Sequence, residues 1–529
     1  MMLQDNGYIF KPHELPMMAG SPATPDMSGK RRLLYGLTGF FLAVAAGLQN
    51  GLMTANIANL RGELGLTLQE GGWVTLAYFM TYTTASILFF KIRPHFGLAK
   101  FIRWTLLLVL ASNVLQVFFR SYEVEIIARL MMGMGTSGLF TLGVLYAMLS
   151  VAGMAKVALI VILSGLMQVA ATLALIITPN LFDDGNMQAV FVFQGAITAL
   201  ATACVLALRL PPTLEQKSLS WRDVLSFVLY TVGIALLCAF LIQGQIVWWT
   251  TDWLGYLLAL AVLAIGLMML IELNRAKPLI DWRWALGRNM LMFLIISFLT
   301  RVFTAEQGTG ANGFLQALGL TTSQLITYYT IIGLSSVAGI VLSVIRLDIK
   351  DIRRPIVVAL FGIALGSYLD IGVSSQTPVS YFYISQAILA FSSFYFAGPV
   401  MLEGMVRAMA KSTDYIVSFI AVFAVSQTLG ALLGSAVFGY FITYKTREHY
   451  ANISQQLTDT PANLLPNLIR QANLEATVLA YNDLFYLIFL CAGTSFVISL
   501  FAWLYRRVRG INVLANEMVA LEAINPSKK

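Results

Sequence analysis

Apolar segments long enough to cross a lipid bilayer recur along most of the chain. A helix needs about 20 residues to cross roughly 30 Å of hydrocarbon, where it satisfies its own backbone hydrogen bonds. The pattern therefore predicts an all-α polytopic membrane protein with fourteen spans. They lie near 33–57, 72–92, 102–119, 125–150, 156–178, 188–208, 222–244, 253–272, 290–314, 321–345, 355–372, 379–405, 414–441 and 484–505.

Basic residues cluster at alternate ends of the predicted spans. The intervening links LFDDGNM, IVWWTTD and DIGVSSQTPVS contain no lysine or arginine. Segments on the cytoplasmic side carry an excess of these residues, so both termini are predicted to be cytoplasmic, with a mobile tail at 1–29 and a second tail at 511–529. The basic clusters lie within Lys30 to Arg32, Lys91 to Arg103, Arg275 to Arg288, Arg346 to Arg354 and Arg506 to Arg509.

Composition narrows the classes of function. Hydrophobic residues make up 58% of the 529 residues and charged residues 11%, whereas soluble domains carry about 25% charged residues. The net charge of +8 is spread over short clusters between spans, which argues against nucleic-acid binding. The three cysteines and three histidines show no metal-ligand spacing, and no nucleophile-base or phosphate-loop pattern is present. We therefore expect no enzyme activity, no metal and no cofactor.

One predicted outside segment is long and polar. Residues 444–483 follow the thirteenth span, and apolar residues recur within them at roughly helical spacing from Leu464 to Leu479. One interpretation is a solvated hairpin with a helix lying on the outer surface. The other is a docking element for a periplasmic partner.

Three stretches resemble a known transporter family. GLQNGLMTANIANLRGELGLTLQEGGWVTLAYFM (47–80) resembles the first-span region of fourteen-span drug/proton antiporters of the major facilitator superfamily, the EmrB/QacA type. ARLMMGMGTSG (128–138) resembles the superfamily's fourth-span motif, an arginine followed by glycines. The run 385–457 resembles the family's spans 12 and 13 and the loop after them. These matches follow the family's order along most of the chain.

The resemblance implies the major facilitator fold, in which two six-helix halves flank two additional spans. Here the halves would be 30–210 and 289–510, the additional spans would lie within 211–288, and the second half would contain the periplasmic loop 444–483. The relatives it resembles most are inner-membrane pumps of bacterial tripartite exporters. That implies a bacterial inner-membrane location, a small-molecule substrate, protons as coupling ions, and a membrane-fusion adaptor and outer-membrane duct as partners.

Departures from the family pattern bear on proton coupling. The family carries an aspartate in span 1, where this chain has Gln49 by the register fixed on Trp73. The loop after span 2 reads FFKIRPHFGLAKF, with Pro94 in place of the family's acid, and the fifth-span antiporter motif retains only Pro179 at its far end. An amide does not release a proton at working pH, so Gln49 can bind a substrate but cannot carry the proton.

Polar groups inside spans are costly and are usually functional. Arg129, near the outer end of span 4, is predicted to take part in proton coupling or to hold an anionic group; a structural salt bridge is the alternative. Gln49, Asn50 and Asn56 fall on adjacent sides of span 1, which predicts a stripe lining a substrate cavity; bonds between packed helices are the alternative. The span-4 glycines should permit close helix approach, and they are Gly133, Gly135 and Gly138.

The stretch FLTRVFTAEQGTGANGFL, residues 298–315, carries two charges of opposite sign within an apolar span. Helical rise places Arg301 near mid-membrane and Glu306 about 7 to 8 Å closer to the outside, pointing about 140° away from it. The two should not pair, so either each meets a partner on another helix or the helix breaks at the glycines after Glu306. A loosened helix end in an aqueous vestibule is the alternative. Glu306 is the first candidate for the proton-binding group.

Other candidates complete the predicted site. Asp370, near the outer end of span 11, is a second candidate for proton coupling, unless it is merely interfacial. Glu403 is interpreted as a surface pair with Arg407, one helical turn later. The remaining predicted substrate-cavity residues are Phe303, Asn312 and Tyr395.

The sequence thus favours a secondary active exporter of small amphipathic or drug-like compounds, coupled to inward proton flow. The alternative is an uncoupled facilitator, or a lipid or metabolite transporter, of the same fold. The missing span-1 acid favours this alternative. A scaffold without transport is disfavoured, because buried charges without a path are costly.

Overall fold

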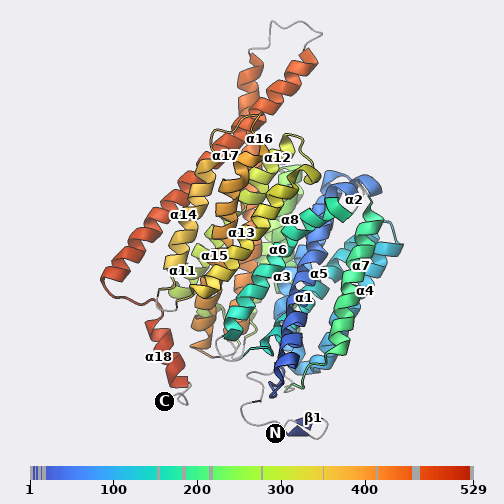
Figure 1. Ribbon diagram of the computed structural model, residues 1–529, viewed down its shortest axis with the longest axis vertical. Coiled ribbons are helices and arrows are strands. Elements are labelled where there is room, and N and C mark those ends of the chain that lie inside the picture. The colour runs from blue at the N-terminus through green and yellow to red at the C-terminus, as the bar shows by residue number, and fades with distance from the viewer. Residues whose placement is uncertain are drawn as a thin grey trace. The chain divides into compact units, whose positions relative to one another are not determined.

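The computed structural model describes residues 4–5, 8–9, 14, 20–151, 155–181, 186–213, 219–275, 278–348, 351–412, 415–455 and 465–524. These residues are almost entirely helical (Figure 1). Near the N-terminus, β1 (Gln4–Asp5) pairs with β2 (Tyr8–Ile9) in a short antiparallel hairpin.

Helices follow one another along the rest of the described chain. They are α1 (Gly29–Ala55), α2 (Ile57–Leu64), α3 (Leu68–Phe96), α4 (Leu98–Phe118), α5 (Tyr122–Met148), α6 (Ala155–Leu181), α7 (Met187–Ala207), α8 (Trp221–Val247), α9 (Asp252–Leu273), α10 (Trp282–Ala285), α11 (Arg288–Thr304), the π-helix η2 (Glu306–Asn312), α12 (Gly313–Ala317), η3 (Thr322–Leu325), α13 (Ile326–Ile345), α14 (Arg354–Leu369), η4 (Val379–Tyr381), α15 (Phe382–Met409), α16 (Tyr415–Ser454), α17 (Leu465–Val508) and α18 (Ala515–Ile524).

Each of the fourteen predicted spans coincides with a helix or with a run of joined helices. Among the described residues, thirteen of these are long and apolar enough to cross a membrane. The fourteenth, α14, has 16 residues and would rise about 24 Å, slightly less than the hydrocarbon thickness. The predicted all-α polytopic fold class is confirmed.

The chain folds into two compact units. Unit 1 comprises Met1–Met292, Gly404–Thr428 and Ala520–Lys529, and unit 2 comprises Phe293–Glu403 and Leu429–Val519. The boundaries predicted for the six-helix halves and the additional spans, 30–210, 211–288 and 289–510, stay predictions.

Glycines bring the helices of unit 1 close together. Gly47 of α1 packs directly against the Met167 carbonyl oxygen on α6, where a Cβ atom would clash. The three span-4 glycines also pack closely: Gly133 against the Tyr78 carbonyl oxygen on α3, and Gly135 and Gly138 against Val109 and Thr105 on α4. Their predicted role in close packing is confirmed. Because lipid gives helices little hydrophobic reason to associate, such close backbone contact stabilises the bundle.

Helix α15 has the same kind of contact in unit 2. Gly339 of α13 packs against the Phe391 carbonyl oxygen, and Gly362 and Gly366 of α14 pack against Ser392 and Ser385. Side chains on this face of α15 are therefore held at short range from both neighbouring helices.

Part of the predicted N-terminal tail is packed and not mobile. Ala23 is fully buried, and its N–H donates to the Pro212 carbonyl oxygen at 3.0 Å. Pro22 forms a β-bridge with Thr213, and Gly20 lies against Pro94. The expectation of a free tail is therefore wrong for residues 20–26, while most of residues 1–19 lie outside the described part of the chain.

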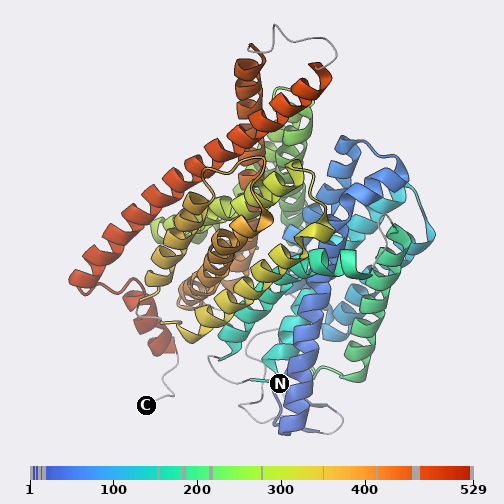
Figure 2. The same cartoon turned by 45° about the horizontal axis from the view of Figure 1, so that its top comes forward.

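Helices α16 and α17 are much longer than a membrane requires. Their 40 and 44 residues would rise about 60 and 66 Å, roughly twice the hydrocarbon thickness. Both views show their distal parts side by side (Figures 1 and 2). We call residues 441–454 of α16 and 465–483 of α17 the helical extension. The predicted helix is present in this segment, but it continues α17 instead of lying on the outer surface, and 456–464 lie outside the described residues.

The sequence signal for this extension is a set of small residues. Ala472, Ala476 and Ala480 of α17 are buried, one on each helical turn, while Ile469 and Leu479 are 41% and 42% exposed. Apolar periodicity points to the larger side chains, although three of the four buried residues between 466 and 480 are alanines and only Val478 is larger.

Close packing predicts that Gly47→Ala destabilises unit 1. The new methyl group has no space against Met167 unless α1 and α6 move apart, which costs about 1 to 3 kcal/mol. Gly255→Ala on α9 is the matched control, since nothing lies within 4 Å of its Cβ position. Thermal unfolding of detergent-solubilised protein should show a lower melting temperature for Gly47→Ala only. Equal melting temperatures would contradict the packing described for α1.

Candidate functional site

Two buried carboxylates share one side-chain amide in unit 2. Glu306 and Asp370 are both 0% exposed. The Gln386 Nε2 atom donates to Asp370 Oδ2 at 2.8 Å and lies 3.2 Å and 3.4 Å from Glu306 Oε1 and Oε2. An amide nitrogen carries two N–H donors, so it can serve both acids at once. We call these three side chains the acid pair and its amide.

The π-helix η2 positions Glu306. This residue begins η2, which is followed directly by α12. Gly310 and Gly313 let α17 approach, because a Cβ at these positions would lie 3.1 Å from the Phe485 ring and 2.9 Å from the Tyr481 hydroxyl. The sequence left two possibilities for Glu306, a partner on another helix or a break in its own helix. Glu306 meets Gln386 of α15, and its own helix widens into a π-turn without breaking. Such turns are often found at functional sites. Because Glu306 is fully buried, it does not lie in an open vestibule of unit 2.

Two polar atoms near the acid pair have no hydrogen-bond partner among the described residues. They are Asp370 Oδ1 and the hydroxyl oxygen of Tyr328 on α13. Tyr328 lies within electrostatic reach of both carboxylates. Buried polar atoms normally have a partner, and one that lacks a protein partner is often satisfied by a bound ion, a water molecule or a substrate group.

Arg301 does not neutralise the acid pair. Its Nη1 atom donates to Thr304 Oγ1 at 3.4 Å, and its Cβ lies against Gly430 of α16. Within the described part of the chain, no carboxylate lies within ion-pair distance of Arg301, which agrees with the prediction that it would not pair with Glu306. Likewise, neither member of the acid pair has a cationic partner among the described residues of unit 2.

Glu403 is buried and pairs with a distant arginine. It is fully buried and accepts a bond from Arg353 Nη2 at 2.7 Å. The interpretation of Glu403 as one half of a surface pair is therefore wrong, because Glu403 and Arg407 are at most 6% exposed. The sequence gives no sign that the link between α13 and α14 reaches the end of α15.

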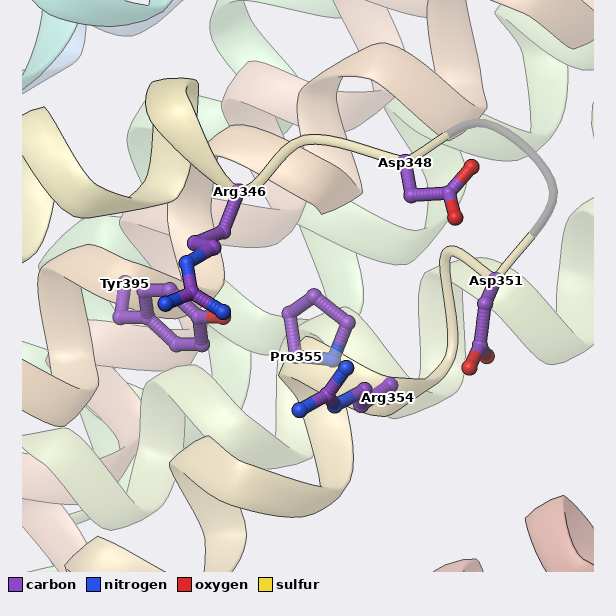
Figure 3. A pocket seen from close by; sticks show the side chains of 6 residues that line it. All are labelled: Arg346, Asp348, Asp351, Arg354, Pro355 and Tyr395. Atoms are coloured by element: carbon purple, nitrogen blue, oxygen red, sulfur yellow. The ribbon is translucent and has the colours of Figure 1, made fainter.

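The three substrate-cavity candidates of unit 2 lie in different surroundings. Asn312 ends η2, and its Oδ1 accepts a bond from the Tyr329 hydroxyl at 2.7 Å. Phe303 packs against the cluster of Ile363, Ala364 and Ala492. Tyr395 lines a small pocket at the link between α13 and α14 (Figure 3). The other pocket-lining residues are Arg346, Asp348, Asp351, Arg354 and Pro355. Of these three candidates, only Asn312 shares an element with Glu306.

A buried amide network surrounds Gln49 in unit 1. Gln49 Nε2 donates to Thr198 Oγ1 at 2.9 Å and to the Gln194 carbonyl oxygen at 3.3 Å, both on α7. Asn113 of α4 donates to the same Thr198 hydroxyl at 3.0 Å. Gln49 is 0% exposed, so its contacts are bonds between packed helices. Contact with a substrate stays a prediction for this residue.

The network ends at a buried acid. Gln194 Nε2 donates to Gln116 Oε1 at 3.2 Å, and Gln116 Nε2 donates to Glu125 Oε1 at 2.8 Å. All three side chains are at most 4% exposed. The amide of Gln49 therefore belongs to a connected set of hydrogen bonds, and an ionised aspartate at this position would lose the donor to Thr198.

Arg129 is buried one helical turn after Glu125. Its Nη2 donates to Asn50 Oδ1 at 2.7 Å, and its guanidinium lies 4.7 Å from the centre of the Tyr78 ring. Its Nε and Nη1 atoms are buried without a partner among the described residues. Asn56 donates to Thr178 Oγ1 at 3.1 Å on α6, an interhelical bond. The structure thus joins Arg129 to Asn50 but not to Gln49 or Asn56.

Several residues of the two networks were missed from the sequence. Gln386 and Tyr328 in unit 2, and Gln116 and Gln194 in unit 1, are polar side chains within predicted spans. The cost of burying an amide in a membrane is the signal that could have found the three glutamines. The same cost that singled out Gln49 in span 1 applies to the spans that contain these glutamines.

The amide network predicts that Gln116→Ala destabilises unit 1. The change removes the donor to buried Glu125 and the acceptor of Gln194, and each lost partner costs about 1 to 3 kcal/mol. Gln168→Ala is the matched control, because Gln168 is exposed and bonds within its own helix. Thermal unfolding in detergent should separate the two variants clearly. A Gln116→Ala protein as stable as Gln168→Ala would argue against the network.

Comparison with known proteins agrees with this architecture. Residues 39–435 match the family model of the Major Facilitator Superfamily. No curated protein matches the sequence. Among solved structures, the chain is similar to the proton:xylose symporter XylE (TM-score 0.52, 14% identity, 93% of this chain and 100% of that chain). It is also similar to a peptide transporter POT in complex with sulfate (TM-score 0.57, 13% identity, 93% and 97%). It is similar as well to a structure described in work on substrate recognition in proton dependent oligopeptide transporters (TM-score 0.55, 13% identity, 91% of this chain and 100% of that chain).

At these identities the solved structures show the fold alone, whereas the family model covers most of the chain. The protein belongs to the major facilitator superfamily of membrane transporters.

Proposed function

We propose that this transporter is a proton-coupled exporter of small amphipathic or drug-like compounds, and that the acid pair of Glu306 and Asp370 binds the coupling proton. The observation that carries the proposal is the amide shared by two fully buried carboxylates without a cationic partner among the described residues of unit 2. Arg301 and Arg129 stay predicted coupling residues.

Electrostatics favours a proton on this pair. The carboxylate oxygens nearest to Gln386 Nε2 lie 2.8 and 3.2 Å from it. Two unit charges about 6 Å apart repel by roughly 3 kcal/mol at an effective dielectric of about 20. Burial away from water adds a further cost to each ionised group. One proton shared by the pair removes most of both costs, and access to water on the opposite side of the membrane would favour its release.

The substitution of Gln49 for the family's acid is consistent with this assignment. In the first unit, position 49 takes part in a neutral network and offers no proton. The proton site would then lie in the second unit, and Asn312, at the other end of the same π-helix, would be a substrate contact on the same element. Gln49, Asn50, Asn56, Phe303 and Tyr395 stay predicted contacts.

The proposal includes the topology and partners predicted from the sequence. The protein would lie in a bacterial inner membrane with cytoplasmic termini, and the helical extension would project on the periplasmic side. There it would contact a membrane-fusion adaptor that leads to an outer-membrane duct. The length of α16 and α17 supports a projection, since about half of each helix exceeds the hydrocarbon thickness.

Glu306→Gln should abolish transport driven by a pH gradient while substrate binding is retained, because the amide fills the same volume but cannot titrate. Purified protein in liposomes, with a pH-sensitive dye inside and a panel of amphipathic compounds, measures both proton and substrate movement. Glu123→Gln, at an exposed position in the first turn of α5, is the matched control and should behave as wild type.

Two outcomes would contradict the proposal in different ways. Gradient-driven transport by Glu306→Gln at the wild-type rate would remove Glu306 from the coupling site. Substrate movement by the wild-type protein without proton movement would favour the uncoupled facilitator of the same fold.

A photoreactive amino acid at Ile469 should crosslink in cells to the proposed adaptor. Ile469 is exposed on the helical extension, whereas Ile498, 70% exposed within the apolar part of α17, is the matched control that should contact lipid. Mass spectrometry of the crosslinked product identifies the partner. If neither position captures a membrane-fusion adaptor, the tripartite assembly is contradicted and the transport proposal is unaffected.

A further inference from the structure

One helical turn of α17 contacts both segments that carry the acid pair. Tyr481 packs edge-on against Phe314 of α12 with ring centres 5.5 Å apart, and its hydroxyl faces Gly313. Phe485, one turn later, packs against Gly310 of η2. These contacts hold the π-helix that begins at Glu306. We call residues 481–485 the α17 turn.

Asn482, within the same turn, holds the chain immediately after Asp370. Its Oδ1 accepts bonds from the N–H groups of Gly372 at 2.6 Å and Val373 at 3.0 Å. Its Nδ2 donates to the Val373 carbonyl oxygen at 2.7 Å. Gly372 has φ of 90°, a conformation that a side chain would strain, so the turn after Asp370 has one preferred shape. Three bonds to this turn fix where α14 ends.

The next residue, Asp483, ties the α17 turn to the part of the helical extension that belongs to α16. Asp483 Oδ2 lies 3.0 Å from His449 Nε2 and 3.8 Å from Lys445 Nζ, both on α16. Two turns earlier on α17, Glu475 Oε1 accepts a bond from Ser375 at 2.6 Å, again in the segment that follows Asp370. Helix α17 therefore contacts both the distal part of α16 and the segment that follows α14.

We infer that Asn482 is a positioning residue for Asp370, and that the α17 turn makes the acid pair respond to the position of the helical extension. A displacement of α17 along its axis would move the end of α14 through Asn482 and the π-helix through Tyr481 and Phe485. The separation of Glu306 and Asp370 would change with it. This inference rests on the proposed function, because it concerns the regulation of the same proton site.

Titratable and charged groups surround the acid pair on several helices. Tyr328 faces it from α13, whereas the neighbouring Tyr329 donates to Asn312 at the end of η2. Tyr481 lies on α17, and Arg301 is about one turn before Glu306, on α11. His449, Lys445 and Asp483 lie on the extension and reach the pair only through the helix. Because Asn482 carries no charge, a substitution at this position can affect the proton site only by moving the side chains of the acid pair.

The test measures protonation of each acid without measuring transport. Dicyclohexylcarbodiimide reacts with protonated carboxyl groups in the membrane, and mass spectrometry gives the fraction of Glu306 and Asp370 labelled at each pH. In Asn482→Ala, the freed end of α14 lets the two carboxylates separate and repel less. The pH of half-labelling of Asp370 should fall by about one unit, a tenfold change in proton affinity.

Matched variants separate positioning from general damage. Asn467→Ala, at an exposed position on the same helix, should leave the labelling curve unchanged. The double variant Lys445→Ala and His449→Ala releases Asp483 from α16 and should shift the curve in the same direction by a smaller amount. Thermal unfolding of each variant shows whether the protein is still folded during labelling.

The labelling curves test three parts of the proposal separately: the proton site, the role of Asn482 and the connection to the helical extension. If wild-type Glu306 and Asp370 show no pH-dependent labelling, the proposed proton site is overturned. If they titrate and Asn482→Ala gives the wild-type curve in a folded protein, the positioning role is overturned. If Asn482→Ala shifts the curve but the double variant does not, the connection to the extension is overturned.

Discussion

The Gln386 amide between two buried carboxylates is the interaction on which the second unit depends. Carboxylates away from water need donors or counter-charges, and within the described residues of unit 2 the acid pair has no counter-charge. The packing of α15 places this amide, because Gly339, Gly362 and Gly366 on neighbouring helices allow close approach to its backbone. This close packing places Gln386 Nε2 within reach of both Glu306 on η2 and Asp370 at the end of α14.

The two units treat buried polarity in different ways. In unit 1, Gln49, Asn113, Gln116 and Gln194 form a chain of amide bonds that uses neutral donors and acceptors. These amides stabilise the packing of α1, α4 and α7, and they do not themselves titrate over the physiological range. In unit 2, two acids share one amide nitrogen, and a proton on either acid changes their interaction strongly. The asymmetry is the physical basis for placing proton coupling in the second unit.

Much of the architecture was predictable from the sequence, and the reasons are local. A span needs about 20 apolar residues wherever it lies, so the helices could be counted from hydropathy without knowledge of their neighbours. Glu306 and Asp370 could each be selected because charge in a membrane is costly. The glycines after Glu306 indicated an irregular helix, but not whether it would break or widen. Glu403 was misassigned to the surface because its partner Arg353 comes from a segment distant along the chain.

The sequence by itself determined which side chains are chemically exceptional in this protein, since apolar surroundings make every buried acid, arginine or amide stand out. Only the tertiary structure decided which of them meet. Gln386 is 80 residues from Glu306 and 16 from Asp370 along the chain, and their contact depends on how η2, α14 and α15 pack. Sequence spacing fixes neighbours within one helix, whereas the contacts between helices depend on packing that no single segment encodes.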